Sequence, residues 1–241
     1  MLSRFTEGAN ALGSVVPRRE DERGLSWAKH DGGVLIHRGA TVVRVSWEAR
    51  GVVRVGARWN GDGVPALHDG PMLDPGRSPH PVRFSARESE QELVLSDGTL
   101  ALHIDRSTGG FSYRDRRGEL LFAEQGAGGG DMEPRVDTRG FQARLALTVP
   151  GDQALYGLGQ HEDGVLDRRG RHLDLYQHNL KVSVPFLLSS RAWGLLWHCY
   201  SAMSFDDDVS GTTLRADCVD ETDYFVIAGD SMDGVIAGCR R

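Results

Sequence analysis

The stretch Tyr156–Gly164 reads YGLGQHEDG, and two further blocks follow it: VPFLLSS at 184–190 and WGLLW at 193–197. In the first block, Gly157 and Gly159 flank a single leucine. A Gly-x-Gly pair alone is weak evidence, because the third glycine and the helical continuation that a dinucleotide site needs are missing. The informative feature is the order of the three blocks together with the strand patterns around them.

The third block predicts a buried strand. Trp193 and Trp197 are separated by an even number of residues, so both lie on one face of a strand, and Leu195 shares that face. Large apolar residues on a common strand face usually belong to the core. We therefore expect core packing here, and not a platform of Trp193, Trp197 and Tyr200 that stacks against a sugar ring.

Alternation of apolar and polar residues predicts further strands upstream. The apolar residues occupy every second position in 41–48 and again in 53–59, and the short linker between these segments predicts an antiparallel hairpin. Glycine-containing turns join three more strands at 99–105, 111–115 and 119–124 into a meander. The pattern is that of an all-β protein built as a large antiparallel β-sandwich.

Three segments depart from this pattern. Residues 124–142 contain several glycines among charged side chains and predict a mobile surface loop inserted in one domain. Residues 1–24, with a run of charged residues, predict a solvated tail or an edge segment, so the sandwich domain is expected to cover 25–241. Apolar residues at helical spacing after a serine predict a short C-terminal helix over about 231–240.

Composition excludes several classes of function. The 241 residues carry a net charge of −6, so nucleic acid and membrane surfaces are not expected partners. Cys199, Cys218 and Cys239 form an odd set without CxxC spacing, which argues against a disulfide framework and against a structural zinc site. The first residues lack the unbroken apolar segment of a secretory signal, so a cytoplasmic location is expected. No cofactor is predicted.

The blocks resemble a known family when they are taken in order. The alternating block at 41–59, the turn region LHIDRSTGGFSYRD at 102–115, the region 156–205 and the segment DYFVIAG at 223–229 resemble the β-sandwich that precedes the catalytic barrel in glycoside hydrolase family 31. The resemblance covers most of the chain and implies a galactose mutarotase-like supersandwich. Within the family, the continuation after Gly159 and the asparagine at position 179 are similar to members that act on α-xylosides.

The resemblance implies a non-catalytic role. In this family the carboxylate nucleophile and the carboxylic acid that cleave the α-glycosidic bond lie in the barrel, and the chain ends at Arg241, where family members continue toward it. We therefore expect a domain that packs on a missing barrel and lends a loop to the sugar pocket, and we nominate no catalytic residue. An α-linked carbohydrate would be a partner only through the full-length enzyme.

The resemblance also indicates which residues contact the sugar. Family members send a loop toward the barrel mouth between the first two blocks, and the matching stretch here is 176–180. We expect contacts from Gln177, His178 and above all Asn179, because an amide both donates and accepts hydrogen bonds, as sugar hydroxyls do. The alternative is that Asn179 caps a turn and His178 is simply exposed. His161 is expected to hold backbone groups near the glycines.

Other sites and functions have less support. The run Asp206–Asp208 lacks the ligand spacing of a calcium loop, so it predicts a solvated turn and no metal site. An autonomous carbohydrate-binding module would need an open aromatic face. An aldose epimerase would need a histidine base and a glutamate acid converging on one concave face. The spacing in the sequence favours no such pair between His103, His161, His172 or His198 and a nearby glutamate. An apolar surface left uncovered by the barrel would favour homo-oligomers.

Overall fold

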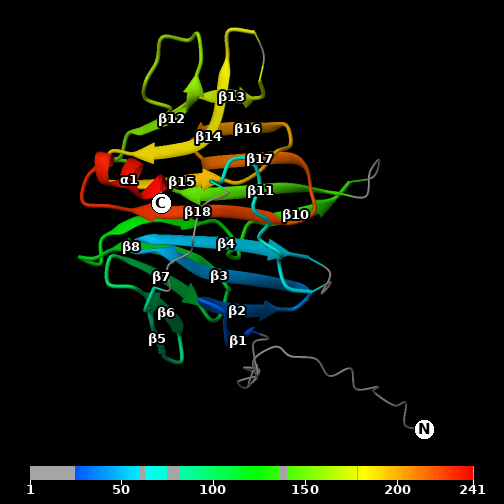
Figure 1. Ribbon diagram of the computed structural model, residues 1–241, viewed down its shortest axis with the longest axis vertical. Coiled ribbons are helices and arrows are strands. Elements are labelled where there is room, and N and C mark those ends of the chain that lie inside the picture. Colours follow the sequence, from blue (N-terminus) through cyan, green and yellow to red (C-terminus); the bar gives the residue numbers. More distant parts are fainter. Residues whose placement is uncertain (1–24, 60–62, 75–81, 136–139, 178, 241) are drawn as a thin grey trace.

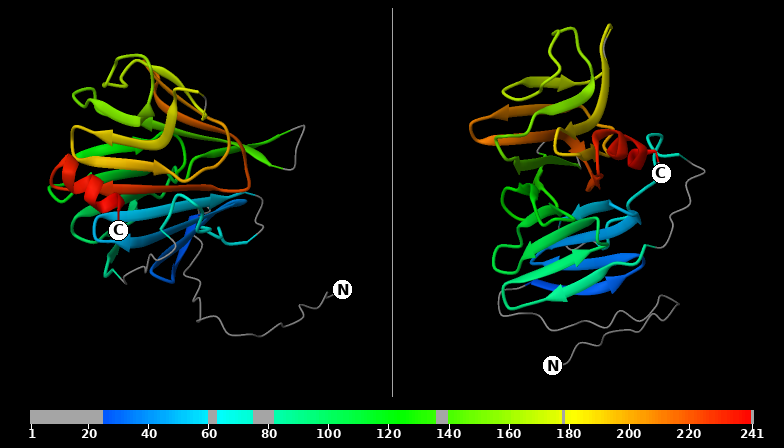
Figure 2. Two further views of the ribbon diagram at one scale, coloured as in Figure 1. Left: turned by 45° about the horizontal axis from the view of Figure 1, so that its top comes forward. Right: turned by 90° about the vertical axis from the view of Figure 1, so that its left-hand side faces the viewer.

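The computed structural model describes residues 25–59, 63–74, 82–135, 140–177 and 179–240. Two antiparallel sheets pack face to face (Figures 1 and 2), which confirms the predicted sandwich. The right-hand view of Figure 2 shows the blue strands β1–β4 and the green strands β7–β9 in separate layers. The strand order is β1-β2-β3-β4-β18-β15-β14-β12 in the eight-stranded sheet and β13-β16-β17-β11-β9-β8-β7-β6-β5 in the ten-stranded sheet, where β10 also pairs with β11.

The strands are short and follow one another closely. The eight-stranded sheet contains β1 (Leu25–His30), β2 (Gly33–Arg38), β3 (Thr41–Ala49), β4 (Val52–Arg58), β12 (Leu155–Gln160), β14 (Val182–Ser189), β15 (Trp193–Trp197) and β18 (Thr222–Ala228). The ten-stranded sheet contains β5 (Ser85–Glu88), β6 (Glu92–Ser96), β7 (Leu100–Asp105), β8 (Phe111–Asp115), β9 (Leu120–Glu124), β10 (Asp131–Pro134), β11 (Phe141–Thr148), β13 (His172–Leu175), β16 (Met203–Asp208) and β17 (Gly211–Val219). The predicted hairpin is β3–β4, and the predicted meander is β7–β8–β9.

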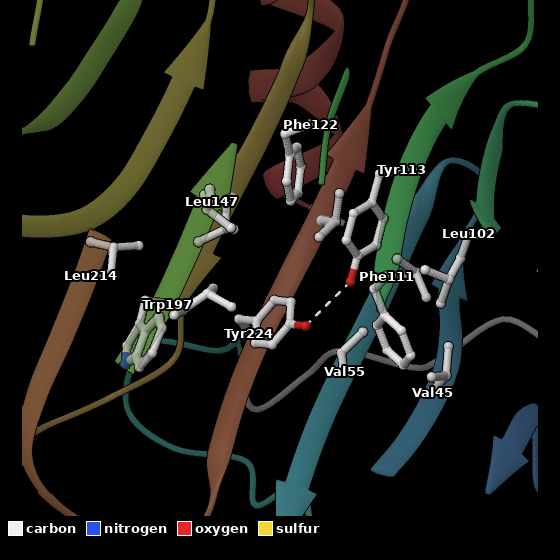
Figure 3. Packing of buried hydrophobic residues seen from close by; sticks show 14 of the residues in the cluster. Val45, Val55, Leu102, Phe111, Tyr113, Phe122, Leu147, Trp197, Leu214 and Tyr224 are labelled. Atoms are coloured by element: carbon white, nitrogen blue, oxygen red, sulfur yellow. Dashed lines mark hydrogen bonds between the residues drawn. The ribbon is translucent and has the colours of Figure 1, made fainter. Parts of the chain in front are cut away.

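Alternate residues of the two facing sheets form the main core. Figure 3 shows part of it, with Val45 and Val55 of one sheet near Leu102 and Phe111 of the other. Trp193 and Trp197 are 0% and 1% exposed, so their predicted core position is confirmed. Tyr200 differs from them because it lies beyond the end of β15 and is 55% exposed.

The outer face of the eight-stranded sheet carries a smaller apolar cluster under the C-terminal helix. Helix α1 (Met232–Cys239) confirms the predicted element, and the Ser231 hydroxyl caps it by accepting a hydrogen bond from the Gly234 N–H. Val235 is fully buried against β4 and β18, whereas Met232 and Ile236 remain about two-fifths exposed. The helix is thus anchored to the sheet through one side chain of its apolar face.

The glycine-rich segment after β9 is not the surface loop that the sequence predicts. Gly128 and Gly129 are buried, and a β-carbon added at Gly129 would lie only 2.8 Å from the Cβ atom of Ala57 on the opposite sheet. The segment then continues into β10, which pairs with β11. The prediction was wrong because glycines, which have no side chain, allow the backbone to pass between the sheets. A buried glycine segment and an exposed glycine loop have the same composition, so composition alone does not distinguish them. Residues 136–139 lie outside the described ranges.

A buried carboxylate joins the two sheets where this segment turns inward. Glu124 at the end of β9 accepts hydrogen bonds from the Tyr113 hydroxyl at 2.9 Å, from the Gly129 N–H at 2.8 Å and from the Tyr224 hydroxyl. The two tyrosine oxygens lie 3.2 Å apart (Figure 3), one on each sheet. Burial raises the pKa of Glu124 above its ordinary value, and burial together with this carboxylate raises the pKa of both tyrosines.

The glycine block Tyr156–Gly164 forms a bulge at the edge of the eight-stranded sheet. Gly157, Leu158 and Gly159 all have positive φ angles, of 96°, 65° and 96°. The pairing with β14 shifts across them, and the Leu158 side chain turns fully into the core. His161 Nε2 lies 2.9 Å from the Leu158 carbonyl oxygen, which confirms that this histidine holds backbone groups. The block therefore has a structural role.

Replacing Gly159 by alanine should be severely destabilising. A β-carbon at this position would lie 1.8 Å from the Val182 carbonyl oxygen, and the φ angle of 96° strains any side-chained residue. We expect Gly159→Ala to lower the free energy of unfolding by about 3 kcal/mol or more in urea denaturation. The matched control is Gly164→Ala, where φ is 64° and no atom lies within 4 Å, so the loss should be only about 1–2 kcal/mol. Equal losses of unfolding free energy in the two variants would contradict the close backbone approach at Gly159.

Glu124 should make folding stability depend on pH. Because its pKa is raised in the folded state, its contribution is fully present below the unfolded value near 4.5 and is lost as pH rises through the folded pKa. The amide of Glu124→Gln does not titrate. In urea denaturation we expect the wild-type stability, measured relative to this variant, to fall by at least about 1 kcal/mol between pH 5 and pH 8.

The control for this experiment is Glu119→Gln, which changes an exposed carboxylate in the turn between β8 and β9. Its stability relative to wild type should not change over the same pH range, because its carboxylate stays in water. If the free energies of unfolding of wild type and Glu124→Gln changed in parallel with pH, Glu124 would not be the source of the pH dependence.

Candidate functional site

The predicted sugar-contacting segment bridges the two sheets. It follows β13 of the ten-stranded sheet and leads into β14 of the eight-stranded sheet. In Figure 1 this connection lies at the top of the molecule, at one end of the sandwich. Tyr176, Asn179 and Leu180 of this connection are all exposed, so it runs over the surface.

Local hydrogen bonds brace the segment. Gln177 Nε2 donates to the Lys181 carbonyl oxygen at 2.7 Å, and the Ser183 hydroxyl donates to the Tyr176 carbonyl oxygen at 3.1 Å. The Lys181 ammonium lies 5.8 Å from the centre of the Tyr176 ring, within the range of a cation–π interaction. Leu180 adopts a φ angle of 67°, which reverses the chain. The amide nitrogen of Gln177 is thus already used to hold the turn.

Asn179 is the residue of this segment with an available polar group. It is exposed, and its side chain makes no hydrogen bond to any other part of the chain that the structure describes. The alternative that Asn179 caps a turn therefore has no hydrogen bond to support it. His178 lies outside the described residues. The role of all three residues in binding sugar stays a prediction.

Exposed apolar side chains surround the same segment. Tyr176 is 46% exposed and Leu180 75% exposed, while Val182 and Val184 at the start of β14 are 47% and 45% exposed. Exposed apolar side chains that gather in one part of a surface are typical of an interface. This end of the sandwich thus has both the available Asn179 amide and exposed apolar side chains.

Two of the histidines are held in ion-paired or hydrogen-bonded networks. His172 on β13 lies 2.5 Å from Asp206, and this hydrogen bond raises the pKa of the imidazole. His198 is buried, with Nδ1 2.7 Å from Asp223 and Nε2 2.9 Å from the Tyr200 hydroxyl. Arg54 binds the Asp223 carboxylate through two nitrogens, at 2.6 and 2.9 Å. This network was not predicted, because its members come from distant strands.

A histidine–glutamate contact was also missed. His103 Nδ1 lies 2.9 Å from a Glu92 carboxylate oxygen on the outer face of the ten-stranded sheet. They line a hollow of about 640 Å³. The sequence could have indicated this contact. A hairpin turn at 97–98 places Val94 opposite His103, and Glu92 then lies diagonally next to His103. The two groups bind each other, whereas an epimerase needs an acid and a base separated by the substrate.

The three aspartates at 206–208 do not form the predicted solvated turn. They are the last residues of β16, and Asp207 is only 8% exposed. Its carboxylate accepts hydrogen bonds from the Thr212 hydroxyl and from the Gly170 N–H. The prediction was wrong because strand pairing with β17 supplies these partners from outside the local sequence. Among the described residues, no group of three or more histidine, cysteine, aspartate or glutamate side chains could hold a metal ion.

Within the described ranges, no helix has the length and hydropathy needed to cross a bilayer.

Comparison with known proteins gives a family. Residues 41–206 match the glycosyl hydrolase 31 N-terminal galactose mutarotase-like domain. An α-xylosidase of Saccharolobus solfataricus is 28% identical over 158 residues, which cover 62% of this chain and 21% of that protein. An uncharacterized family 31 glucosidase of Pseudescherichia vulneris is 30% identical over 179 residues, which cover 64% of this chain and 33% of that protein.

Solved structures agree with this result. The α-xylosidase of Xanthomonas citri is 32% identical, with a TM-score of 0.63, and the match covers 74% of this chain and 20% of that one. A soil-metagenome α-xylosidase complexed with xylose is 22% identical, with a TM-score of 0.68, over 86% of this chain and 32% of that one, a similarity that shows the fold. The chain thus spans a fifth to a third of the length of these relatives.

The family match covers more than half of the chain, and the two-sheet sandwich has the fold of the matched structures. The chain therefore belongs to the N-terminal galactose mutarotase-like domains of glycoside hydrolase family 31.

Proposed function

We propose that this chain is the non-catalytic sandwich domain of an α-glycosidase of the α-xylosidase type. In this proposal the domain packs on a catalytic barrel, and the 176–181 segment reaches the rim of the sugar pocket. Relatives named as α-xylosidases match the chain over a fifth to a third of their own length, which leaves room for a barrel in such a protein.

The observation that carries the proposal is the free amide of Asn179 on a braced, projecting turn. Gln177 holds the turn through Lys181, so the neighbouring Asn179 is presented without losing its own hydrogen-bonding capacity. A neutral amide suits a sugar hydroxyl, which both donates and accepts hydrogen bonds. A preformed turn also lowers the entropy that a loop loses on binding.

The apolar side chains around this turn fit a docked domain. Tyr176, Leu180, Val182 and Val184 would be shielded from water if a barrel packed against this end of the sandwich. Burying apolar surface contributes roughly 25 cal/mol per Å². The autonomous binding-module alternative loses its main support, since Trp193 and Trp197 lie in the core and offer no open aromatic face.

The first test is a domain exchange. Residues 25–240 would replace the matching domain of the Xanthomonas citri α-xylosidase, and kcat/KM would be measured on an aryl α-xyloside. We expect Asn179→Ala to lower kcat/KM about tenfold relative to the unmutated chimera, because one hydrogen bond to the sugar is lost. The control is Gln91→Ala, an exposed amide in the turn between β5 and β6, which should have no effect. Equal activities of all three chimeras would contradict the role of Asn179.

The second test concerns the chain alone. We expect no turnover of aryl α-xylosides or α-glucosides by the purified 241-residue chain, because a retaining glycosidase needs two carboxyl groups roughly 5 Å apart across the scissile bond. Hydrolysis at a rate comparable to that of a complete glycosidase would overturn the non-catalytic assignment.

A further inference from the structure

A hydroxyl, an imidazole and a carboxylate stand on three neighbouring strands on the outer face of the ten-stranded sheet. They belong to Ser112 on β8, His103 on β7 and Glu92 on β6, strands that lie side by side (Figure 1). All three residues line the same hollow of about 640 Å³. These are the side-chain types of a Ser-His-Glu triad, in which serine is the nucleophile, histidine the base and glutamate the group that orients the base.

Strand register brings the hydroxyl and the imidazole together. His103 and Ser112 are direct partners in the β7–β8 pairing, which places their β-carbons about 4.5–5.5 Å apart. The residues that flank each of them along the strand belong to the core, so both side chains point outward. On the other side of Ser112 its partner is Ala123 of β9, whose methyl group is too small to cover the hydroxyl.

Glu92 fixes the orientation of the imidazole. One of its carboxylate oxygens lies 2.9 Å from His103 Nδ1. A carboxylate only accepts hydrogen bonds, so Nδ1 carries the proton and Nε2, which points away from Glu92, is the basic nitrogen. Within the described ranges, neither His103 Nε2 nor the Ser112 hydroxyl is hydrogen-bonded to another group. Both groups are therefore available to a substrate in the hollow.

The hollow also offers donors for a developing oxyanion. Gly126 and Ala127 line it, and their backbone N–H groups have no acceptor in the part of the chain that the structure describes. Two unpaired backbone N–H groups are a common means of stabilising the negative oxygen of a tetrahedral intermediate. The carboxylates of Glu92 and Asp105 lie at the same hollow and disfavour a negatively charged substrate.

We propose that this hollow cleaves short-chain carboxylic esters of uncharged alcohols. Ser112 Oγ bonds to the ester carbonyl carbon while its proton passes to His103 Nε2, and the C–O bond to the alcohol breaks as that proton passes to the leaving oxygen. A water molecule then attacks the acyl-serine in the same way, which releases the carboxylic acid and restores the hydroxyl. Glu92 stabilises the imidazolium, and the N–H groups of Gly126 and Ala127 bind the oxyanion.

The test is hydrolysis of p-nitrophenyl acetate by the 241-residue chain. We expect Ser112→Ala and His103→Gln each to lower kcat/KM about a hundredfold, because the nucleophile or its base is lost. Glu92→Gln should lower it about tenfold, since the base remains but is held less well. The matched control is Ser96→Ala, a serine on the same face of the sheet whose partner on β7 is an alanine, which should behave like wild type.

A second readout separates a serine nucleophile from simple attack by a surface imidazole. Phenylmethylsulfonyl fluoride should inactivate the wild type, and mass spectrometry should place the sulfonyl group on Ser112. The urea midpoint of each variant checks its folding, and Ser112→Cys, which keeps a nucleophile, should retain more activity than Ser112→Ala.

Three results would overturn the proposal: no ester hydrolysis by the wild type, unchanged kcat/KM in Ser112→Ala, or a sulfonyl group found only on other residues. None of them depends on Asn179, on a barrel or on glycoside cleavage. Failure of this proposal is therefore distinguishable from failure of the proposed function.

Discussion

The rest of the structure depends on one buried carboxylate. Glu124 lies between two apolar sheets, where an unpaired charge or an unsatisfied oxygen would be very costly, so it must be hydrogen-bonded. Tyr113 and Tyr224 supply two donors, one from each sheet, and the Gly129 N–H supplies a third. Because Gly129 must reach Glu124, the chain after β9 turns inward, and this turn delivers β10 to the edge of β11. The same interaction joins the two sheets.

The edge of the eight-stranded sheet at β12 depends on backbone conformation instead. Three successive positive φ angles at Gly157, Leu158 and Gly159 shift the register of β12 against β14. Leu158 enters the core, and its carbonyl oxygen accepts a hydrogen bond from His161 Nε2, which stabilises the bulge. The first residues of β14 remain exposed beyond it, and they carry the braced turn with Asn179.

The turn that carries Asn179 lies at the top of the molecule in Figure 1, between β13 and β14. It presents an exposed amide near exposed apolar side chains, and the proposed docking against a neighbouring domain rests on these two features. On the outer face of the ten-stranded sheet, Glu92 and His103 form a hydrogen bond to each other.

The sequence by itself determined the strands, because alternation reports directly which side chains face inward: the hairpin at 41–59, the meander at 99–124, the buried Trp193 and Trp197, and the terminal helix were all predictable. The order of its blocks also indicated the family. Only the tertiary structure decided which distant groups meet. Glu124 and Tyr224 are 100 residues apart, and Asp207 is buried by pairing with a neighbouring strand. The local sequence therefore led to wrong predictions for the glycine segment and for the aspartate run. Periodicity specifies the face on which a residue lies, whereas the partners on that face follow from sheet pairing across the whole chain.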